Sequence, residues 1–324
     1  MDSTFLFLPE IILIASILAI PAIYIATEST KSYSICSNIS LFVSLLLVIL
    51  FWYFPDEVSF DKTSSSYTIY EHFVINDFSQ LFKVIFLITA LAVSFVSSSY
   101  FDESEPHQAE YYVLLLSSAL GMLITASAND FLTIFVGIEL SAFSSYGLVA
   151  FRKTDDKSTE AGAKYLLIGA FSSALTLYGI SLLYALTGSV TFEGVNAFLT
   201  GIDNGVIDGD FNELIFISSL FIIAGLGFKI AVVPFHAWAP DVYEGAPTPV
   251  TALLAAASKA MGFVALFKVF IFTLEPFSDE WSIVLGIIAL VSMTIGNLAA
   301  LSQKDVGRML AYSSIAQAGY ILIA

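Results

Sequence analysis

Charged residues are scarce in this chain, and basic ones are the scarcest. Asp, Glu, Lys and Arg make up 12% of the 324 residues, with 12 Lys and Arg against 28 Asp and Glu. Soluble domains carry about 25% charged residues. A soluble fold of this size could not bury the 57% of residues that are hydrophobic, so lipid must solvate most of the chain. We expect no nucleic-acid partner, because phosphate binding needs clustered cations.

Cysteine and histidine are nearly absent as well. The single cysteine, Cys36, excludes an intrachain disulfide and any cysteine-rich metal or iron–sulfur site, and we expect it to be a small packing residue. The histidines are His72, His107 and His236, and no second histidine or cysteine lies near His236, so we expect no metal there. The sequence has no nucleotide-binding loop, flavin motif or cluster ligands.

What the sequence does contain is a series of long apolar segments. Each is close to the roughly 20 residues that a helix needs to cross a hydrocarbon layer. They should be helices rather than strands, because no water satisfies backbone groups there. The first has no basic leader and is long enough to span, unlike a cleavable signal. The sequence therefore predicts an all-α polytopic membrane protein with about ten spans. We place them at 5–27, 34–54, 78–100, 110–128, 130–150, 161–187, 213–233, 248–274, 281–301 and 308–324.

The basic loop residues predict the orientation. Loops on the cytoplasmic side are enriched in Lys and Arg. With the N-terminus outside, only Lys62 lies in an outer loop, whereas the reverse orientation reverses the count. The longer outer loops are acidic, namely 56–77 and the stretch with Glu193, Asp203, Asp208 and Asp210. The basic residues placed inside are Lys31, Arg152, Lys153, Lys157, Lys304 and Arg308.

Three ionisable residues fall deep inside expected spans: Glu139, Lys229 and Lys259. An unpaired charge at such depth costs about 2.5–3.5 kcal/mol on insertion scales, so a partner, a wet cavity or a function must compensate. A structural ion pair between Glu139 and one lysine is the alternative, although replacing such pairs with apolar residues is often neutral. We therefore assign the three residues to proton transfer. Lys83 and Lys268 lie nearer the outer face, and we expect their amines to extend to the interface.

The second feature is a proline-rich interruption of membrane-like sequence that begins at Pro234. Pro234 cannot donate to the carbonyl of residue 230, so the helix should open just after Lys229, at a half-helix end that favours a cation. Transporters use such breaks to aim backbone groups at ions, although a simple connecting loop is the alternative. His236 lies in the break. Histidine titrates near neutrality, so His236 is either a proton relay or a hydrogen-bonding tether.

These residues lie in a stretch that closely resembles the N-type membrane subunit of NADH:quinone oxidoreductase, respiratory complex I. Residues 227–250 read GFKIAVVPFHAWAPDVYEGAPTPV, and residues 135–140 (FVGIEL) and 304–320 are similar to their counterparts. The sister L- and M-type subunits and the multisubunit sodium/proton antiporters usually have a histidine shortly after the Pro-Thr-Pro-Val segment. This chain has Leu-Leu-Ala at 253–255, which favours the N type.

The resemblance implies an antiporter-like fold of about fourteen helices with two inverted repeats, each holding a broken helix. Residues 110–274 would form the first repeat and 281–324 the start of the second. We interpret the chain as C-terminally truncated, because it ends in apolar sequence. Glu139, Lys229 and Lys259 match the family's fifth-helix glutamate, broken-helix lysine and eighth-helix lysine.

The resemblance also implies a subunit of a proton-translocating enzyme complex in the plasma membrane of a prokaryote. Its partners would be lipid and the other membrane and peripheral subunits of the complex. No redox cofactor is expected on this chain, since quinone, flavin or deazaflavin and iron–sulfur clusters would belong to partner subunits.

A mechanism follows as a hypothesis. Burial lowers the pKa of a lysine and a nearby carboxylate raises it. If Glu139 lies close, Lys229 holds its proton, and drawing the two apart would push the proton toward Lys259, powered by redox chemistry elsewhere. Two alternatives stay open. One is a stand-alone secondary cation/proton antiporter that uses the same residues, and the other is a passive scaffold whose buried charges are structural.

Overall fold

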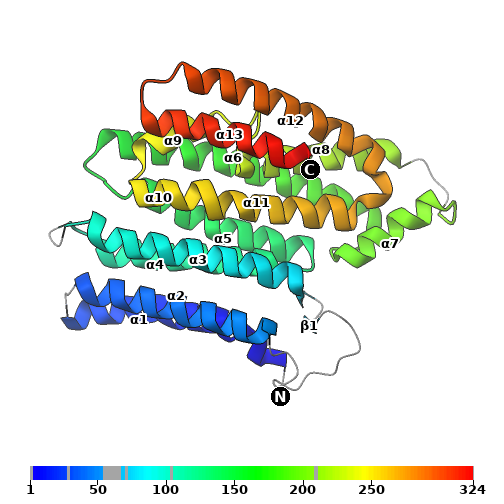
Figure 1. The fold of residues 1–324 in the computed structure, drawn as a ribbon. Coiled ribbons are helices and arrows are strands. Elements are labelled where there is room, and N and C mark those ends of the chain that lie inside the picture. The colour runs from blue at the N-terminus through cyan, green and yellow to red at the C-terminus, as the bar shows by residue number, and fades with distance from the viewer. Residues whose placement is uncertain are drawn as a thin grey trace.

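The protein is a bundle of long helices that lie nearly parallel to one another (Figure 1). The computed structural model describes residues 3–27, 30–53, 67–69, 72–102, 105–207 and 211–323. The hairpin of α1 (Leu8–Thr27) and α2 (Thr30–Tyr53) lies at one edge of the bundle, and α12 (Ser278–Leu301) and α13 (Val306–Ile323) lie at the other.

The remaining helices lie between these two edges. They are α3 (Asp77–Tyr100), α4 (Gln108–Ser127), α5 (Phe131–Val149), α6 (Asp156–Thr187), α7 (Phe192–Asp203), α8 (Asn212–Ile230), α9 (Trp238–Gly245), α10 (Thr248–Leu253) and α11 (Lys259–Leu266). Two π-helical segments belong to the span of α10 and α11: η2 (Leu254–Ser258) joins the two helices, and η3 (Phe267–Thr273) follows α11. Short 3₁₀ turns lie at η1 (Ser3–Phe7) and η4 (Glu275–Phe277). The antiparallel strands β1 (Tyr67–Ile69) and β2 (Phe73–Ile75) precede α3.

The predicted all-α polytopic membrane fold is confirmed. Within the described residues, nine helices are long and apolar enough to cross a membrane, and they coincide with the first nine predicted spans. The tenth predicted span corresponds to α13. Cys36 packs half-buried against the core, as expected of a small packing residue.

The predicted break after Lys229 is also present. Helix α8 ends at Ile230, and the chain re-enters a helix only at Trp238, the first residue of α9. Ala231 adopts a left-handed conformation with φ of 57°, which costs an L-residue about 1–2 kcal/mol, and Val233–Pro234 is a cis peptide. The broken helix of the prediction is therefore the pair α8 and α9.

One helix was not predicted. The stretch with Glu193 and Asp203, which we expect to be an acidic outer loop, instead forms α7, with the Thr191 side chain accepting from the Gly194 backbone N–H at its start. Leu199 and Val195 are fully buried, so this helix lies on the bundle with an apolar face inward. Its length of 12 residues falls short of a membrane span, and this is why hydropathy alone missed it.

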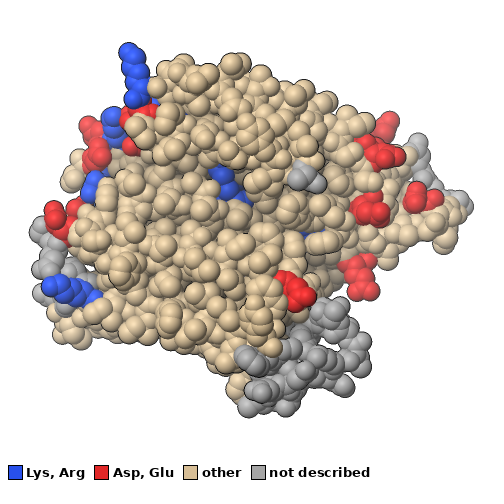
Figure 2. All heavy atoms as spheres, viewed as in Figure 1, with Lys and Arg blue, Asp and Glu red and all other residues tan. Residues whose placement is uncertain are grey.

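Charged side chains gather at the two ends of the bundle (Figure 2). Lys and Arg are seen mainly at the end where α6 and α13 begin, mixed with acidic residues, whereas the opposite end shows acidic residues. The wide band between the ends is almost entirely uncharged, with one small basic patch. Lys62, Asp208, Asp210 and most of the predicted 56–77 loop lie outside the described residues.

The expectation that Lys83 and Lys268 extend to the interface is wrong. Lys83 is 1% exposed and Lys268 is 7% exposed. Each amine is bound inside the bundle, Lys83 by the carboxylate of Glu10 and Lys268 by two backbone carbonyls. Hydropathy predicted the depth of each lysine along its helix but not the face on which it lies.

Candidate functional site

Glu139 lies two and a half turns into α5, held at that depth by the cap of this helix. The side chain of Asp130 accepts from the backbone N–H groups of Leu132 and Thr133, which fixes where α5 begins. Glu139 is half-buried, and its Oε1 accepts a 2.5 Å hydrogen bond from the hydroxyl of Ser173 on α6. A carboxylate in apolar surroundings thus has a specific donor.

Lys229 faces the same small cavity as Glu139. This cavity of about 20 Å³ is also lined by Tyr146, Ser173 and Thr176. Lys229 is 4% exposed, and its Nζ makes no hydrogen bond to any residue that the structure describes. Since a cavity of about 10–15 Å³ is enough for one water molecule, the space suits a single bridging water. Glu139 and Lys229 share a cavity rather than forming a direct ion pair among the described contacts.

The end of α8 that carries Lys229 is fixed from three sides. The indole Nε1–H of Trp238 donates to the carbonyl of Phe228 at 3.0 Å. The backbone N–H of Val233 donates to the Ser292 hydroxyl of α12 at 2.9 Å. On the third side lies Gly262 of α11, where an added Cβ would meet the Ile230 side chain at 2.5 Å. Only glycine allows α11 to approach this closely.

Lys259 lies apart from this cavity, in a groove of about 490 Å³ between α10–α11 and α13. Its side chain is 6% exposed, and Nζ donates to the Ser314 hydroxyl at 2.7 Å. Lys259 directly follows the π-helical η2, a type of distortion that is frequent at functional sites. Gly262, about one turn further along α11, packs beside Lys229, whose Cγ is 3.3 Å from where a Cβ added at Gly262 would lie. Helix α11 therefore begins at Lys259 and also packs against the stem of Lys229.

His236 lies in the connection between α8 and α9, half-buried. Its ring centroid is 6.5 Å from that of Tyr312 on α13, and its Nδ1 makes no hydrogen bond within the described part of the chain. His236 lines neither the Glu139–Lys229 cavity nor the Lys259 groove.

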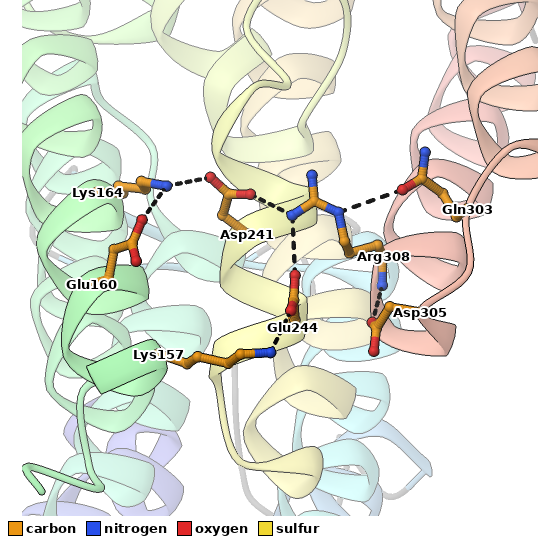
Figure 3. A network of polar contacts seen from close by, with 8 residues as sticks. All are labelled: Lys157, Glu160, Lys164, Asp241, Glu244, Gln303, Asp305 and Arg308. Carbon is orange, nitrogen blue, oxygen red and sulfur yellow. Dashed lines mark hydrogen bonds and ion pairs between the residues drawn. The ribbon is translucent and has the colours of Figure 1, made fainter. Parts of the chain in front are cut away.

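A network of charged residues ties the far side of the break to two other helices (Figure 3). Asp241 of α9 binds Lys164 of α6 and Arg308 of α13, each at 2.6 Å. Glu244, one turn along α9, binds Lys157 at 2.7 Å and Arg308 at 3.1 Å. The network therefore joins α6, α9 and α13 at one end of the bundle.

The two acidic residues of this network are held ionised. Burial acts to raise the pKa of Asp241, but the hydrogen bonds from Lys164 and Arg308 outweigh it, and the pKa is lowered. The hydrogen bonds from Lys157 and then Arg308 lower the pKa of Glu244. Sequence reasoning used Lys157 and Arg308 only for orientation and missed the network, because its partners are up to 87 positions apart.

Sequence reasoning also missed the two hydroxyls that bind the predicted site residues. Neither Ser173 nor Ser314 is among the residues that the sequence assigns to the site. Hydroxyls on small-residue faces opposite a buried charge are the signal that could have identified both.

Residues 128–324 match a protein family described as NADH:quinone oxidoreductase/Mrp antiporter, TM. Among relatives, the chain is 38% identical over 319 residues to F(420)H(2) dehydrogenase subunit N of Methanosarcina mazei, an alignment that covers 98% of this chain and 62% of the relative. It is 46% identical over 258 residues to NADH-quinone oxidoreductase subunit N of Heliobacterium modesticaldum, covering 79% of this chain and 52% of the relative.

Solved structures give a matching fold. A chain of respiratory complex I from Thermus thermophilus superposes with a TM-score of 0.78 at 30% identity, over 98% of this chain and 64% of that one. A chain of the archaeal membrane-bound sulfane sulfur reductase superposes with a TM-score of 0.85 at 25% identity, over 99% and 64%. The chain thus spans between half and two thirds of the length of these relatives.

Proposed function

Because the chain belongs to the NADH:quinone oxidoreductase/Mrp antiporter transmembrane family, we propose that it acts in a proton-translocating membrane subunit of a complex I-like enzyme. The observation that carries the proposal is the shared cavity of Glu139 and Lys229, at the end of a broken helix. A buried lysine without a bound partner is costly in a membrane protein, and transporters place such groups on ion pathways.

The chemistry is a proton transfer controlled by charge. While Glu139 is ionised and near, its negative charge stabilises the ammonium form of Lys229. When the end of α8 moves away from α5, this stabilisation is lost, and the proton leaves Lys229 for the neutral amine of Lys259. One N–H bond breaks as another forms. His236 is either a relay in this transfer or a tether of the break.

The three fixing contacts of α8 suit such a movement. Trp238, Ser292 and Gly262 each touch the last turn of α8 or the residues just after it, from α9, α12 and α11. A shift of any of these helices therefore changes the position of Lys229 relative to Glu139 on α5. Movements of partner subunits that shift α9, α11 or α12 as rigid helices would therefore move Lys229 away from Glu139.

The remaining assignments are part of the same proposal. Residues 110–274 form a first inverted repeat, and residues 281–324 begin a second. The N-terminus lies outside, in keeping with the basic residues that gather where α6 and α13 begin. The partners are the other membrane and peripheral subunits of the complex, which hold the quinone, flavin or deazaflavin and iron–sulfur chemistry. The membrane is the plasma membrane of a prokaryote.

The proposal is tested with Lys229→Met in the assembled complex. We expect the variant to assemble and to lose redox-driven proton pumping by roughly tenfold or more, since a positioned proton-transfer group contributes about that much or more to a rate. Lys304→Met, a change at an exposed lysine, is the matched control and should pump normally. Normal pumping per complex by Lys229→Met would rule out the role of this lysine.

The alternative is a stand-alone secondary cation/proton antiporter, which the family description also includes. It predicts cation/proton exchange by the purified full-length protein in vesicles without redox partners. Exchange that Lys229→Met abolishes under those conditions would favour the antiporter over the redox-driven subunit.

A further inference from the structure

A second set of buried charges lies away from Glu139, Lys229 and Lys259. Lys83 of α3 donates to Oε1 of Glu10 on α1 at 2.6 Å, and the two side chains are 1% and 6% exposed. Both residues are close to the start of their helices, at the end of the bundle where α1 begins. This is the end opposite the network of Asp241 and Glu244 (Figure 1).

Lys268 belongs to the same region. Its Nζ donates to the carbonyls of Ala126 and Ala128 at 2.6 Å each, where α4 ends and α5 is about to begin. Phe78 at the start of α3 contacts Phe267 and Phe272 of η3, which brings the two segments together. Lys83 and Lys268 therefore lie on two segments, α3 and η3, that pack against each other.

Several buried polar atoms in this region have unused hydrogen-bonding positions. Among the described residues, Oε2 of Glu10, Oε1 of Gln80 and Oγ of Ser127 are buried without a hydrogen-bond partner. Structural ion pairs satisfy their remaining lone pairs, because each unmet one costs free energy in an apolar interior. A carboxylate oxygen left free beside a buried lysine is an open position for a proton.

This region has a route to the protein surface. Asp130, 1% exposed, follows Ala128 by two residues and faces Nδ1 of His72 at 3.0 Å. The side chain of His72 is 55% exposed. The backbone N–H of Asn129 also donates to the carbonyl of His72, so the turn that binds Lys268 touches this histidine directly.

Lys268 also lies on the same membrane span as Lys259. It follows Lys259 by nine residues. At 1.5 Å per residue this is about 13 Å along the axis. Both lysines are buried and adjoin π-helical segments, Lys259 just after η2 and Lys268 within η3.

We propose that Lys268 is a proton-release residue at the end of the bundle where α1 begins, and that the Glu10–Lys83 pair controls when it releases. The inference rests on the proposed function, because it needs protons to arrive from Lys259. While Glu10 is ionised, it compensates Lys83, and Lys268 keeps its proton. When Glu10 binds a proton at Oε2, the charge of Lys83 repels that of Lys268. Lys268 then gives its proton to the Asp130–His72 side, so one N–H bond breaks as an N–H or O–H bond forms.

The test distinguishes two roles of Lys268: carrying a proton, or only donating hydrogen bonds to the carbonyls of Ala126 and Ala128. Lys268→Gln keeps an N–H donor for the carbonyls of Ala126 and Ala128 but cannot carry a proton. Lys268→Arg keeps the donors and the charge but does not release its proton. We expect both variants to assemble in the complete complex and to lose redox-driven pumping per complex by roughly tenfold or more. Normal pumping by both assembled variants would overturn the proposal.

The pair is tested with the double variant Glu10→Gln/Lys83→Met, which removes both charges together. We expect it to assemble and to pump fewer protons per electron, because no charge at Lys83 then repels the proton on Lys268. A purely structural pair would give normal pumping. The control is Ser37→Ala/Ser94→Ala, which removes a buried 3.0 Å hydrogen bond between α2 and α3 with no titratable group. This control should pump normally.

Two outcomes keep the inference separate from the proposed function. If Lys229→Met stops pumping but the Lys268 variants pump normally, only the release site is wrong. If Lys229→Met pumps normally, the proposed function itself fails. Should the Lys268 variants not assemble, His72→Gln, a change at an exposed side chain, replaces them, and it should slow pumping. Normal pumping by His72→Gln would then overturn the release site.

Discussion

The indole nitrogen of Trp238 donates a hydrogen bond of 3.0 Å to the carbonyl oxygen of Phe228, across the break between α9 and α8. Phe228 precedes Lys229, so this bond connects the second half of the broken helix to the residue next to the buried lysine. The indole also stacks on Tyr165 of α6, with ring centroids 4.6 Å apart. A displacement of α9 or α6 is therefore transmitted to the last turn of α8.

Trp238→Phe should uncouple this connection while keeping most of the aromatic packing. The change leaves the Phe228 carbonyl without its donor, a loss of about 1–3 kcal/mol for a buried acceptor. We expect a complex that assembles but pumps fewer protons per electron, because Lys229 is less well positioned. The measurement is the proton-to-electron ratio of the purified complex in vesicles. An unchanged ratio would mean that the bond only stabilises the fold.

Gly262→Ala tests the close approach of α11 to the end of α8. The new Cβ would lie 2.5 Å from the Ile230 side chain and 3.3 Å from the Lys229 stem, so α8 must shift. Overpacking of this kind costs about 1–3 kcal/mol. We expect reduced pumping and a lower temperature of thermal unfolding of the complex.

Gly286→Ala is the control for this change. Gly286 lies in α12, and no atom within 4 Å would meet its added Cβ. Gly286→Ala should leave pumping and the unfolding temperature unchanged. Equal effects of the two substitutions would contradict a specific role for the space beside Gly262.

The spans and the break could be predicted from the sequence, because hydropathy and proline act along the chain. A run of apolar residues needs only lipid to become a helix, and Pro234 needs only its missing N–H to end α8 near Lys229. The depth of Glu139, Lys229 and Lys259 follows from the same reading. Their roles in proton transfer stay a prediction.

The contact partners of these residues on neighbouring helices could not be predicted. Ser173 reaches Glu139 from 34 positions away, and Lys268 reaches Ala126 from 142 positions away. The depth of Lys83 and Lys268 was compatible with the interface, but the faces on which they lie are set by how α3 and η3 pack. Such contacts depend on helix rotation, which periodicity does not fix for helices that are apolar on nearly every side.

The network of Asp241 and Glu244 should make stability depend on acidity. Both pKa values are lowered in the folded protein, so the stabilisation is fully present above the unfolded pKa of about 4 and is lost as the pH falls through the lowered values. We expect the thermal unfolding temperature of the detergent-solubilised complex to be flat above about pH 5 and to fall below about pH 4. Asp241→Asn/Glu244→Gln should unfold at a lower temperature near neutral pH, and its unfolding temperature should fall less on acidification.

Glu280→Gln, a change at an exposed residue on the opposite end, controls for the general effect of removing a carboxylate. Other carboxylates also titrate in this range, so the test is the difference in unfolding temperature between the wild type and the double variant at each pH. Unfolding temperatures that are equal at neutral pH and fall together on acidification would show that the network adds no stability.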